Sequence, residues 1–144
     1  MPPDMLAPVS VIMPAYNAAG SISRALASLA AQTRPPAEII VVDDGSTDTT
    51  AAIVQAEIDN LLPSRLVLVT QPNRGAGAAR NRAIEAATQP FLGFLDADDL
   101  WLERKVELCL PAFDDPTVRL VCTDFDLVTP DGRTERLRSS RRLG

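Results

Sequence analysis

The sequence predicts an α/β fold in which helices cover both faces of a mostly parallel central sheet. Short apolar runs rich in Val and Ile recur along the chain, and segments with a helical spacing of apolar residues alternate with them. The runs are apolar at successive positions, so both faces of each strand are expected to be buried. Strands of this kind that alternate with helices are typical of a parallel sheet between two helical layers.

The first strand and helix lie near the N-terminus. Residues 9–13 (VSVIM) predict a strand, and the following PAYNAAG supplies turn-forming residues. Apolar residues then recur at helical spacing over 22–30, behind a capping residue at Ser21, and the prolines at 35–36 end the segment.

The same strand and helix pattern recurs twice in the middle of the chain. Strands are predicted at 38–42 (EIIVV) and 65–69 (RLVLV), and helices follow them at 49–58 and 76–87. The turn DDGSTD carries residues that cap helices, and the later helix is rich in alanine, the best helix former.

The C-terminal third continues the alternation. Residues 91–95 (FLGFL) predict a buried central strand, 100–110 a helix, and 118–125 (VRLVCTDF) a fifth strand. The two cysteines, Cys109 and Cys122, fall in this helix and strand. They are expected to be free core thiols, which suits a reducing cytoplasm.

Composition and charge narrow the class of function. The chain of 144 residues is long enough for one domain with a sizeable core. Its net charge of −5 is uneven, because residues 131–144 hold five arginines against two acids and leave residues 1–130 at −8. The negative charge of residues 1–130 disfavours nucleic-acid binding, because such binding depends on clustered Lys and Arg. We find no signal-peptide pattern and no apolar run of about 20 residues, so we expect a soluble cytoplasmic protein with no transmembrane segment.

Three loops with polar residues follow predicted strands, at 14–17, 43–48 and 96–99. Ligands of parallel sheets bind beyond the carboxyl ends of the strands, so these loops are expected to form one site.

The last of these loops holds Asp96, Asp98 and Asp99, three carboxylates within four positions. Like charges this close repel one another unless a cation lies between them. Carboxylate oxygens are suitable ligands for Mg²⁺ or Mn²⁺. The alternative for one of these residues is to cap the helix predicted from Leu100.

Four motifs, VSVIMPAYN, IIVVDDGSTDTT, NRGAGAARNRAI and FLGFLDADDLW, occur in this order over residues 9–125. Together they resemble family 2 glycosyltransferases of the GT-A fold. The resemblance implies an inverting, metal-dependent transfer of a sugar (a hexosyltransferase reaction) from a nucleotide-diphospho-sugar to an acceptor hydroxyl. It also implies that this chain is the nucleotide-binding half, and that the catalytic base belongs to an acceptor-binding half expected beyond Gly144.

By this resemblance, the DxD motif of the family falls on Asp96, Ala97 and Asp98. Its carboxylates are expected to contact the ribose and the metal ion, Mg²⁺ or Mn²⁺. Asp98 is the first expected metal ligand, followed by Asp99 and then Asp96.

The acidic pair Asp43 and Asp44 ends the second predicted strand. In the family, an acid at this point accepts the imide N–H of uracil or thymine, and Asp44 is the closer match. The alternative is a turn in which Asp43, Ser46 and Asp48 bond nearby amides. Both interpretations are expected to hold, divided among these residues.

The remaining expected contacts with the nucleotide come from two other segments. Tyr16 is expected to pack against the base, which backbone groups of Pro14 and Ala15 also contact. Arg80 is expected to bind the diphosphate, because its planar guanidinium can pair with two oxygens at once. Trp101 is interpreted as a packing residue.

The predicted donor is a UDP- or dTDP-sugar, and the acceptor a glycan or a lipid-linked molecule, in the synthesis of bacterial cell-surface polysaccharide. We expect an N-terminal extension (1–8), an incomplete nucleotide-sugar-binding domain (9–130) and a basic tail (131–144). The tail would contact the inner face of a membrane, or else be a frayed end. The alternative function is a nucleotide-sugar binding module that needs a further domain or partner for catalysis.

Overall fold

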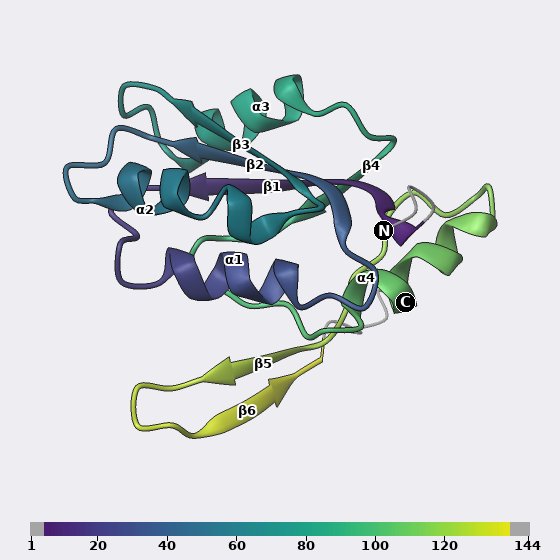
Figure 1. The fold of residues 1–144 in the computed structure, drawn as a ribbon. Helices are drawn as coiled ribbons and strands as arrows, with labels where there is room; N and C mark the ends of the chain where they lie inside the picture. The colour runs from purple at the N-terminus through teal and green to yellow at the C-terminus, as the bar shows by residue number, and fades with distance from the viewer. Residues whose placement is uncertain (1–4, 139–144) are drawn as a thin grey trace. The chain divides into compact units, whose positions relative to one another are not determined.

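The structure is a computed structural model that describes residues 5–138. The chain divides into two compact units after Leu108. The strands of the first unit are β1 (Ala7–Ala15), β2 (Pro36–Asp43), β3 (Arg65–Thr70) and β4 (Phe91–Phe94). Its helices are α1 (Ile22–Ala30), α2 (Thr50–Ala56), the short 3₁₀ helix η2 (Asp59–Leu61) and α3 (Ala76–Ala86). The strands and helices alternate as predicted (Figure 1).

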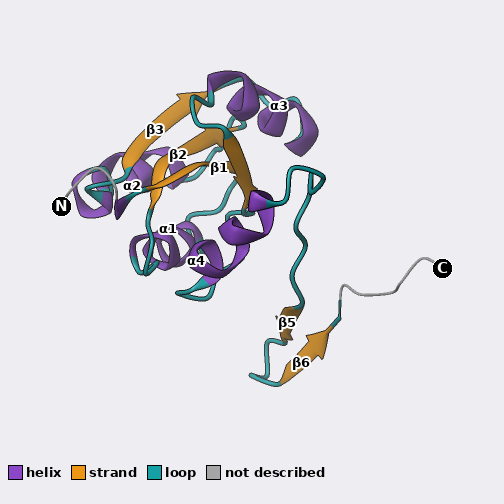
Figure 2. Cartoon of the chain, turned by 90° about the vertical axis from the view of Figure 1, so that its right-hand side faces the viewer, coloured by secondary structure: helices purple, strands orange, loops and turns teal. Residues whose placement is uncertain are grey.

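The four strands form one parallel sheet in the order β3-β2-β1-β4. Helix α3 covers one face of the sheet, and α1 and α2 lie on the other (Figure 2). The predicted α/β fold with helices on both faces is therefore confirmed. Because β2 and β3 lie on one side of β1 and β4 on the other, the chain reverses its direction of winding between β1 and β4. Such a switch point is where open parallel sheets bind ligands.

The core is built around β1 and β2, whose side chains alternate between the two faces of the sheet. Ile12, Ile40 and Val42 pack with Ala79 and Ala83 of α3, and all five are buried. The small alanine side chains allow α3 to lie close to the sheet, which accounts for the alanine-rich sequence of that helix.

A buried polar network lies near the amino ends of the strands. The carboxylate of Glu38 is 3% exposed and accepts hydrogen bonds from Ser10 Oγ (2.5 Å) and the Thr88 backbone N–H (2.6 Å). Ser10 Oγ in turn accepts from the Gln89 N–H at 3.1 Å, and Arg65 lies 3.8 Å from the same carboxylate. The network therefore ties the connection between α3 and β4 to β1 and β2.

Strand β4 lies at an edge of the sheet, so the prediction of a buried central strand at 91–95 is wrong in this respect. Within residues 5–138 it pairs only with β1, and Leu92 and Phe94 are 41% and 52% exposed. An apolar run does not distinguish a central strand from an edge strand, because strand order depends on contacts between segments distant in sequence.

The predicted helix over 100–110 is also wrong in extent, because α4 covers only Lys105–Cys109. The N–H of Trp101 donates to Ser28 Oγ at 3.2 Å, and the C=O of Leu102 accepts from Gln32 Nε2 at 2.9 Å. The Val106 N–H, which would bond to the Leu102 C=O in a helix over 100–110, donates instead to Gln32 Oε1 at 3.2 Å, so Gln32 binds both members of that helical pair. The alternative in which an aspartate caps a helix from Leu100 is therefore wrong.

The second unit contains a short 3₁₀ helix, η3 (Leu110–Asp114), and an antiparallel hairpin of β5 (Phe125–Val128) and β6 (Thr134–Leu137). The predicted fifth strand at 118–125 is wrong, because regular structure begins only at the last of these residues. Both cysteines are free, but Cys122 is exposed and Cys109 only half-buried, so the prediction of core thiols is wrong too.

The boundary expected at residue 130 falls in the turn of this hairpin. In the expected basic tail, Arg133 pairs with Asp131 at 3.1 Å and Arg136 with Asp126 at 2.9 Å. The tail's last residues, 139–144, lie outside the described range. Among the described residues, no helix combines the length and the apolar character that a membrane crossing requires.

Candidate functional site

A pocket of about 520 Å³ opens at the carboxyl ends of the four parallel strands. The loops that follow all four strands contribute to its walls. Its lining residues are Pro14, Ala15, Tyr16, Asn17, Ala18, Ser21, Asp44, Asn73, Gly75, Ala76, Arg80, Asp96, Ala97 and Asp98. Most of the predicted site residues are therefore brought together around one cavity. Asp43 and Asp99 are not among the lining residues.

The loop after β1 is fastened to the loop after β2. Asn17 has a positive φ of 46°, its Oδ1 accepts from the Thr47 N–H (2.8 Å), and its own N–H donates to Ser46 Oγ (2.9 Å). The N–H of Ala18 donates to Thr50 Oγ1 at 2.9 Å. Asparagine tolerates this left-handed conformation better than most residues. These bonds fix the backbone next to Tyr16, which lines the pocket with its side chain half exposed.

The two neighbouring aspartates at the end of β2 have different surroundings. The Asp43 carboxylate is buried and accepts hydrogen bonds from both the backbone N–H and the hydroxyl of Ser46. Asp48 closes the same loop by accepting from the Thr50 N–H at 2.9 Å. Asp43 thus has the geometry of the predicted turn, whereas Asp44 faces the pocket.

Asp44 is only 3% exposed, and three donors converge on its carboxylate. Gln71 Nε2 and the Arg74 N–H donate to Oδ1, each at 2.8 Å, and the Gly75 N–H donates to Oδ2 at 2.9 Å. Burial opposes ionisation, but these hydrogen bonds outweigh it and hold the pKa of Asp44 below its ordinary value. Asp44 is therefore an anion at neutral pH, and it also holds the loop after β3 in place.

Gly45 allows the loops after β2 and β3 to approach each other closely. Its φ is +76°, and a Cβ at this position would lie 2.8 Å from the backbone nitrogen of Asn73. Gly45→Ala is expected to reduce the free energy of unfolding by about 1–3 kcal/mol, because alanine is strained at this φ and displaces the loop. Urea denaturation measures this change.

Gly20→Ala is the matched control, because a Cβ there has nothing within 4 Å. It should leave the unfolding midpoint nearly unchanged. Equal midpoints for the two alanine variants would contradict the close approach at Gly45.

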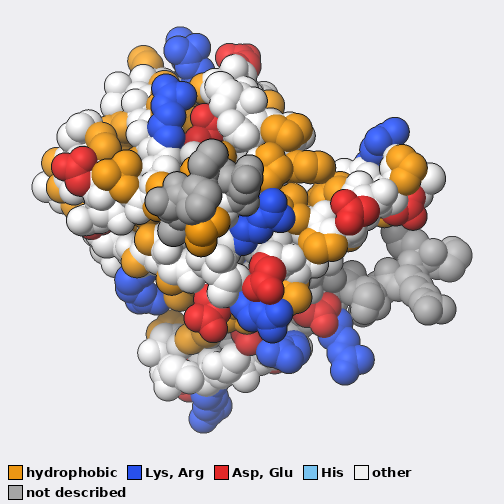
Figure 3. Space-filling model, turned by 45° about the vertical axis from the view of Figure 1, so that its right-hand side comes forward, with side chains coloured by type: hydrophobic (Ala, Val, Ile, Leu, Met, Phe, Trp, Pro, Cys, Tyr) orange, Lys and Arg blue, Asp and Glu red, His pale blue; other side chains and the backbone are white. Residues whose placement is uncertain are grey.

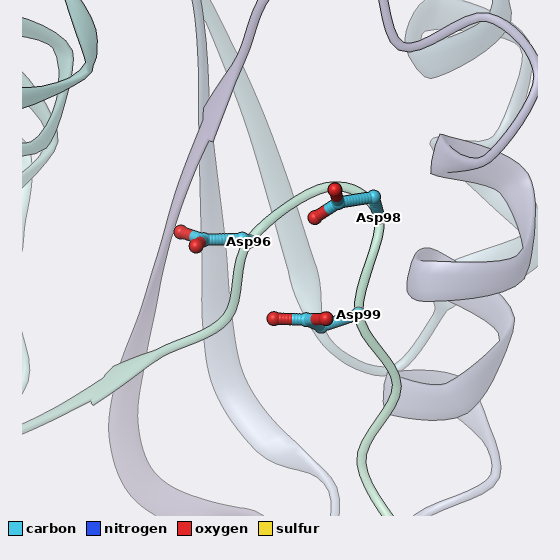
Figure 4. Close-up of side chains that lie close together, drawn as sticks. All are labelled: Asp96, Asp98 and Asp99. Carbon is cyan, nitrogen blue, oxygen red and sulfur yellow. The ribbon is translucent and has the colours of Figure 1, made fainter. Parts of the chain in front are cut away.

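The acidic loop after β4 gathers its three carboxylates. The potential ligand atoms of Asp96, Asp98 and Asp99 all lie within 4.8 Å of one another, and Figure 4 shows the side chains extending toward one side of the loop. Loss of solvent around Asp99, together with the charges of Asp98 and Asp96, raises the pKa of its carboxyl. A cation placed among these oxygens would relieve that repulsion.

Arg80 links α3 to this acidic loop, because its Nη2 donates to Asp96 Oδ1 at 2.8 Å. Both side chains are partly exposed and both line the pocket. Arg80 is thus a positive group placed beside the carboxylates.

Trp101 packs outside the pocket lining, against β4. A Cβ on Gly93 would lie 2.6 Å from Cη2 of the indole, so only glycine leaves room for the ring. The amine of Lys105 lies 5.5 Å from the ring centroid, a cation–π distance. These contacts agree with the packing interpretation, and they anchor the chain just after the acidic loop.

Sequence reasoning missed Asn17, Thr47, Thr50 and Gln71. The first three connect two loops, and the fourth reaches across from the end of β3. Only the left-handed tendency of asparagine gave a local signal for any of them.

The model of the glycosyl transferase family 2 matches residues 10–143. A relative in Bacillus subtilis, the putative teichuronic acid biosynthesis glycosyltransferase TuaG, is 38% identical over 126 residues, which cover 86% of this chain and 49% of TuaG. The chain thus spans about half of that relative's length.

The solved structures that are similar to the chain include one of TarS and one of a mannosyltransferase. Residues 1–349 of Staphylococcus aureus TarS, in complex with UDP, superpose with a TM-score of 0.66 at 30% identity, over 87% of this chain and 43% of that one. The mannosyltransferase PcManGT from Pyrobaculum calidifontis, in complex with GDP-Man and Mn²⁺, has a TM-score of 0.62 at 35% identity, over 67% and 29%. Since the family model matches nearly the whole sequence, the chain belongs to glycosyl transferase family 2.

Proposed function

We propose that this chain binds a nucleotide-diphospho-sugar together with a divalent metal ion, for inverting transfer of the sugar to an acceptor hydroxyl. The observation that carries the proposal is the convergence of Asp44, Arg80 and the acidic loop on one pocket. TarS bound to UDP and PcManGT bound to GDP-Man and Mn²⁺ support this choice of ligands. The donor we favour is a UDP- or dTDP-sugar, used in making a surface polysaccharide at the inner face of a membrane.

The pocket offers a place for each part of such a donor. Tyr16, with the backbone of Pro14 and Ala15, would flank the base, and Asp44 would accept its imide N–H. Arg80 would give up part of its contact with Asp96 and pair with the diphosphate. Figure 3, in which the carboxyl ends of the strands are turned away from the viewer, shows positive and negative side chains interspersed over the face in view.

The acidic loop fits Mg²⁺ or Mn²⁺, because its three carboxylates are hard oxygen donors that repel one another without a cation. Asp98 and Asp99, with Asp96, would hold the ion, and Ala97 would let the backbone between them approach the donor. When bound, the metal ion supplies positive charge that stabilises the negative charge developing on the departing diphosphate.

The alternative function, a nucleotide-sugar binding module, is favoured by one observation. The carboxylates that line the pocket within the described residues are Asp44, Asp96 and Asp98. All three are assigned to the donor or the metal, so none of them is left to deprotonate an acceptor. Catalysis would then need a base from a further domain or partner.

Calorimetric titration of the chain with UDP, with and without Mn²⁺, tests the shared part of both functions. We expect binding that is at least about tenfold tighter with Mn²⁺, because Asp96, Asp98 and Asp99 would hold the ion and its positive charge would attract the diphosphate. Absence of metal-dependent binding would overturn both functions. Turnover of UDP-glucose, measured as release of UDP, then separates an enzyme from a binding module.

A further inference from the structure

We propose that Gln71 is a positioning residue that leaves Asp44 one free acceptor position and thereby favours uracil or thymine over guanine. This inference rests on the proposed function, because it concerns how the same pocket chooses among nucleotides. Gln71 does not itself line the pocket and acts through Asp44.

The ends of β2 and β3 place the two side chains together. Asp43 and Thr70 are partners in the strand register, so the next residues, Asp44 and Gln71, leave the sheet side by side. The N–H of Gln71 donates to the Asp43 carbonyl at 3.0 Å, which fixes its backbone. Its side-chain amide must present the NH₂ group to Asp44, since an ionised carboxylate only accepts hydrogen bonds.

The hydrogen bonds at Asp44 account for most of its accepting capacity. An ionised carboxylate offers about four acceptor positions, two on each oxygen. Gln71 and the Arg74 N–H occupy Oδ1, and the Gly75 N–H occupies one position on Oδ2. One position therefore stays available for a ligand, on the oxygen that Gln71 does not contact.

The candidate bases differ in the number of donors that they present together. Uracil and thymine carry one imide N–H between two carbonyl groups, whereas guanine presents its ring N–H and its exocyclic amino group side by side. A carboxylate with one free position satisfies the first pattern and leaves one guanine donor without a partner. Because a buried donor without a partner is costly, the pocket should discriminate against guanine.

The test compares the affinities of UDP, dTDP and GDP, each with Mn²⁺, for the wild type and for Gln71→Met. Methionine has nearly the shape of glutamine but lacks the donor. The wild type should bind UDP and dTDP more tightly than GDP. In Gln71→Met the ratio of the GDP to the UDP dissociation constant should fall about fivefold, because the Asp44 carboxylate, no longer held by the Gln71 donor, can turn to accept both guanine donors. Gln55→Met, at an exposed position of α2, is the matched control and should leave the ratio unchanged.

The outcomes separate the inference from the function on which it rests. If the wild type binds none of the nucleotides, the proposed function fails and the inference fails with it. If the wild type binds UDP but Gln71→Met weakens UDP and GDP equally, Gln71 is only structural and the inference is overturned while the function stands. A wild type that prefers GDP overturns the inference without any variant, so a poorly folded Gln71→Met still leaves it testable.

Discussion

Replacing Asp98 by Asn is expected to weaken Mn²⁺-dependent UDP binding by more than about a hundredfold, because even residues that only support metal ligands contribute about 10- to 100-fold to metal affinity. Asp98 lines the pocket and belongs to the cluster whose oxygens lie within 4.8 Å of one another. The amide keeps the shape of the side chain and removes its charge. Titration of UDP at several Mn²⁺ concentrations measures the effect.

Two comparisons show whether the loss comes from the metal site. Binding of UDP without Mn²⁺ should change little in Asp98→Asn, since the base contacts do not involve this residue. Asp59→Asn removes the same charge from the exposed start of η2, away from the pocket, and should bind like the wild type. If Asp98→Asn keeps wild-type affinity in the presence of Mn²⁺, Asp98 is not a metal ligand.

The largest expected effect on stability is that of Glu38→Ala, which should lower the free energy of unfolding by about 3 kcal/mol. The substitution removes a buried carboxylate that accepts from Ser10 and from Thr88. It also frees the connection that leads into β4. Urea denaturation followed by circular dichroism measures the change, and Glu85→Ala, at an exposed position of α3, is the control.

The pH dependence of the free energy of unfolding tests whether the charge of Glu38 causes this stabilisation. Burial opposes its ionisation, but hydrogen bonds from Ser10 and Thr88 and the charge of Arg65 hold its pKa below the ordinary value of 4.5. The charge therefore stabilises the folded chain above pH 4.5, and this contribution is lost as the pH falls through the folded-state pKa. The stability difference between the wild type and Glu38→Gln should shrink below that pH. If this stability difference stays constant down to pH 3, Glu38 stabilises the chain through packing and not through its charge.

The fold of the first unit could be predicted from the sequence because its signals are local. The apolar runs of β1 and β2 and the alanine spacing of α3 specify strands and a helix without knowledge of the partners. The segment that contains Trp101 could not be predicted in the same way. Its helical pattern is real, but Gln32, some 70 residues earlier, binds the Leu102 C=O and the Val106 N–H, which would bond to each other in a helix.

The residues of the candidate site show the same difference between local and non-local signals. Charged residues that line the pocket, such as Asp44, Asp96 and Asp98, could be predicted, since loops after parallel strands meet at one edge. Residues such as Gln71 and Asn17 could not be predicted, because they form hydrogen bonds across loops that are distant in sequence. The turn at Ser46 distinguishes Asp43 from Asp44, although the two are identical and adjacent in the sequence.

The polar network around Glu38 lies at the opposite end of the sheet from the pocket. Substitutions at sites that are far apart and share no partners usually have additive effects. Changes in the loops at the pocket end should therefore add their own cost in stability without weakening the network around Glu38. The amino end of the sheet thus serves as a foundation whose strength does not depend on which loops stand at the other end.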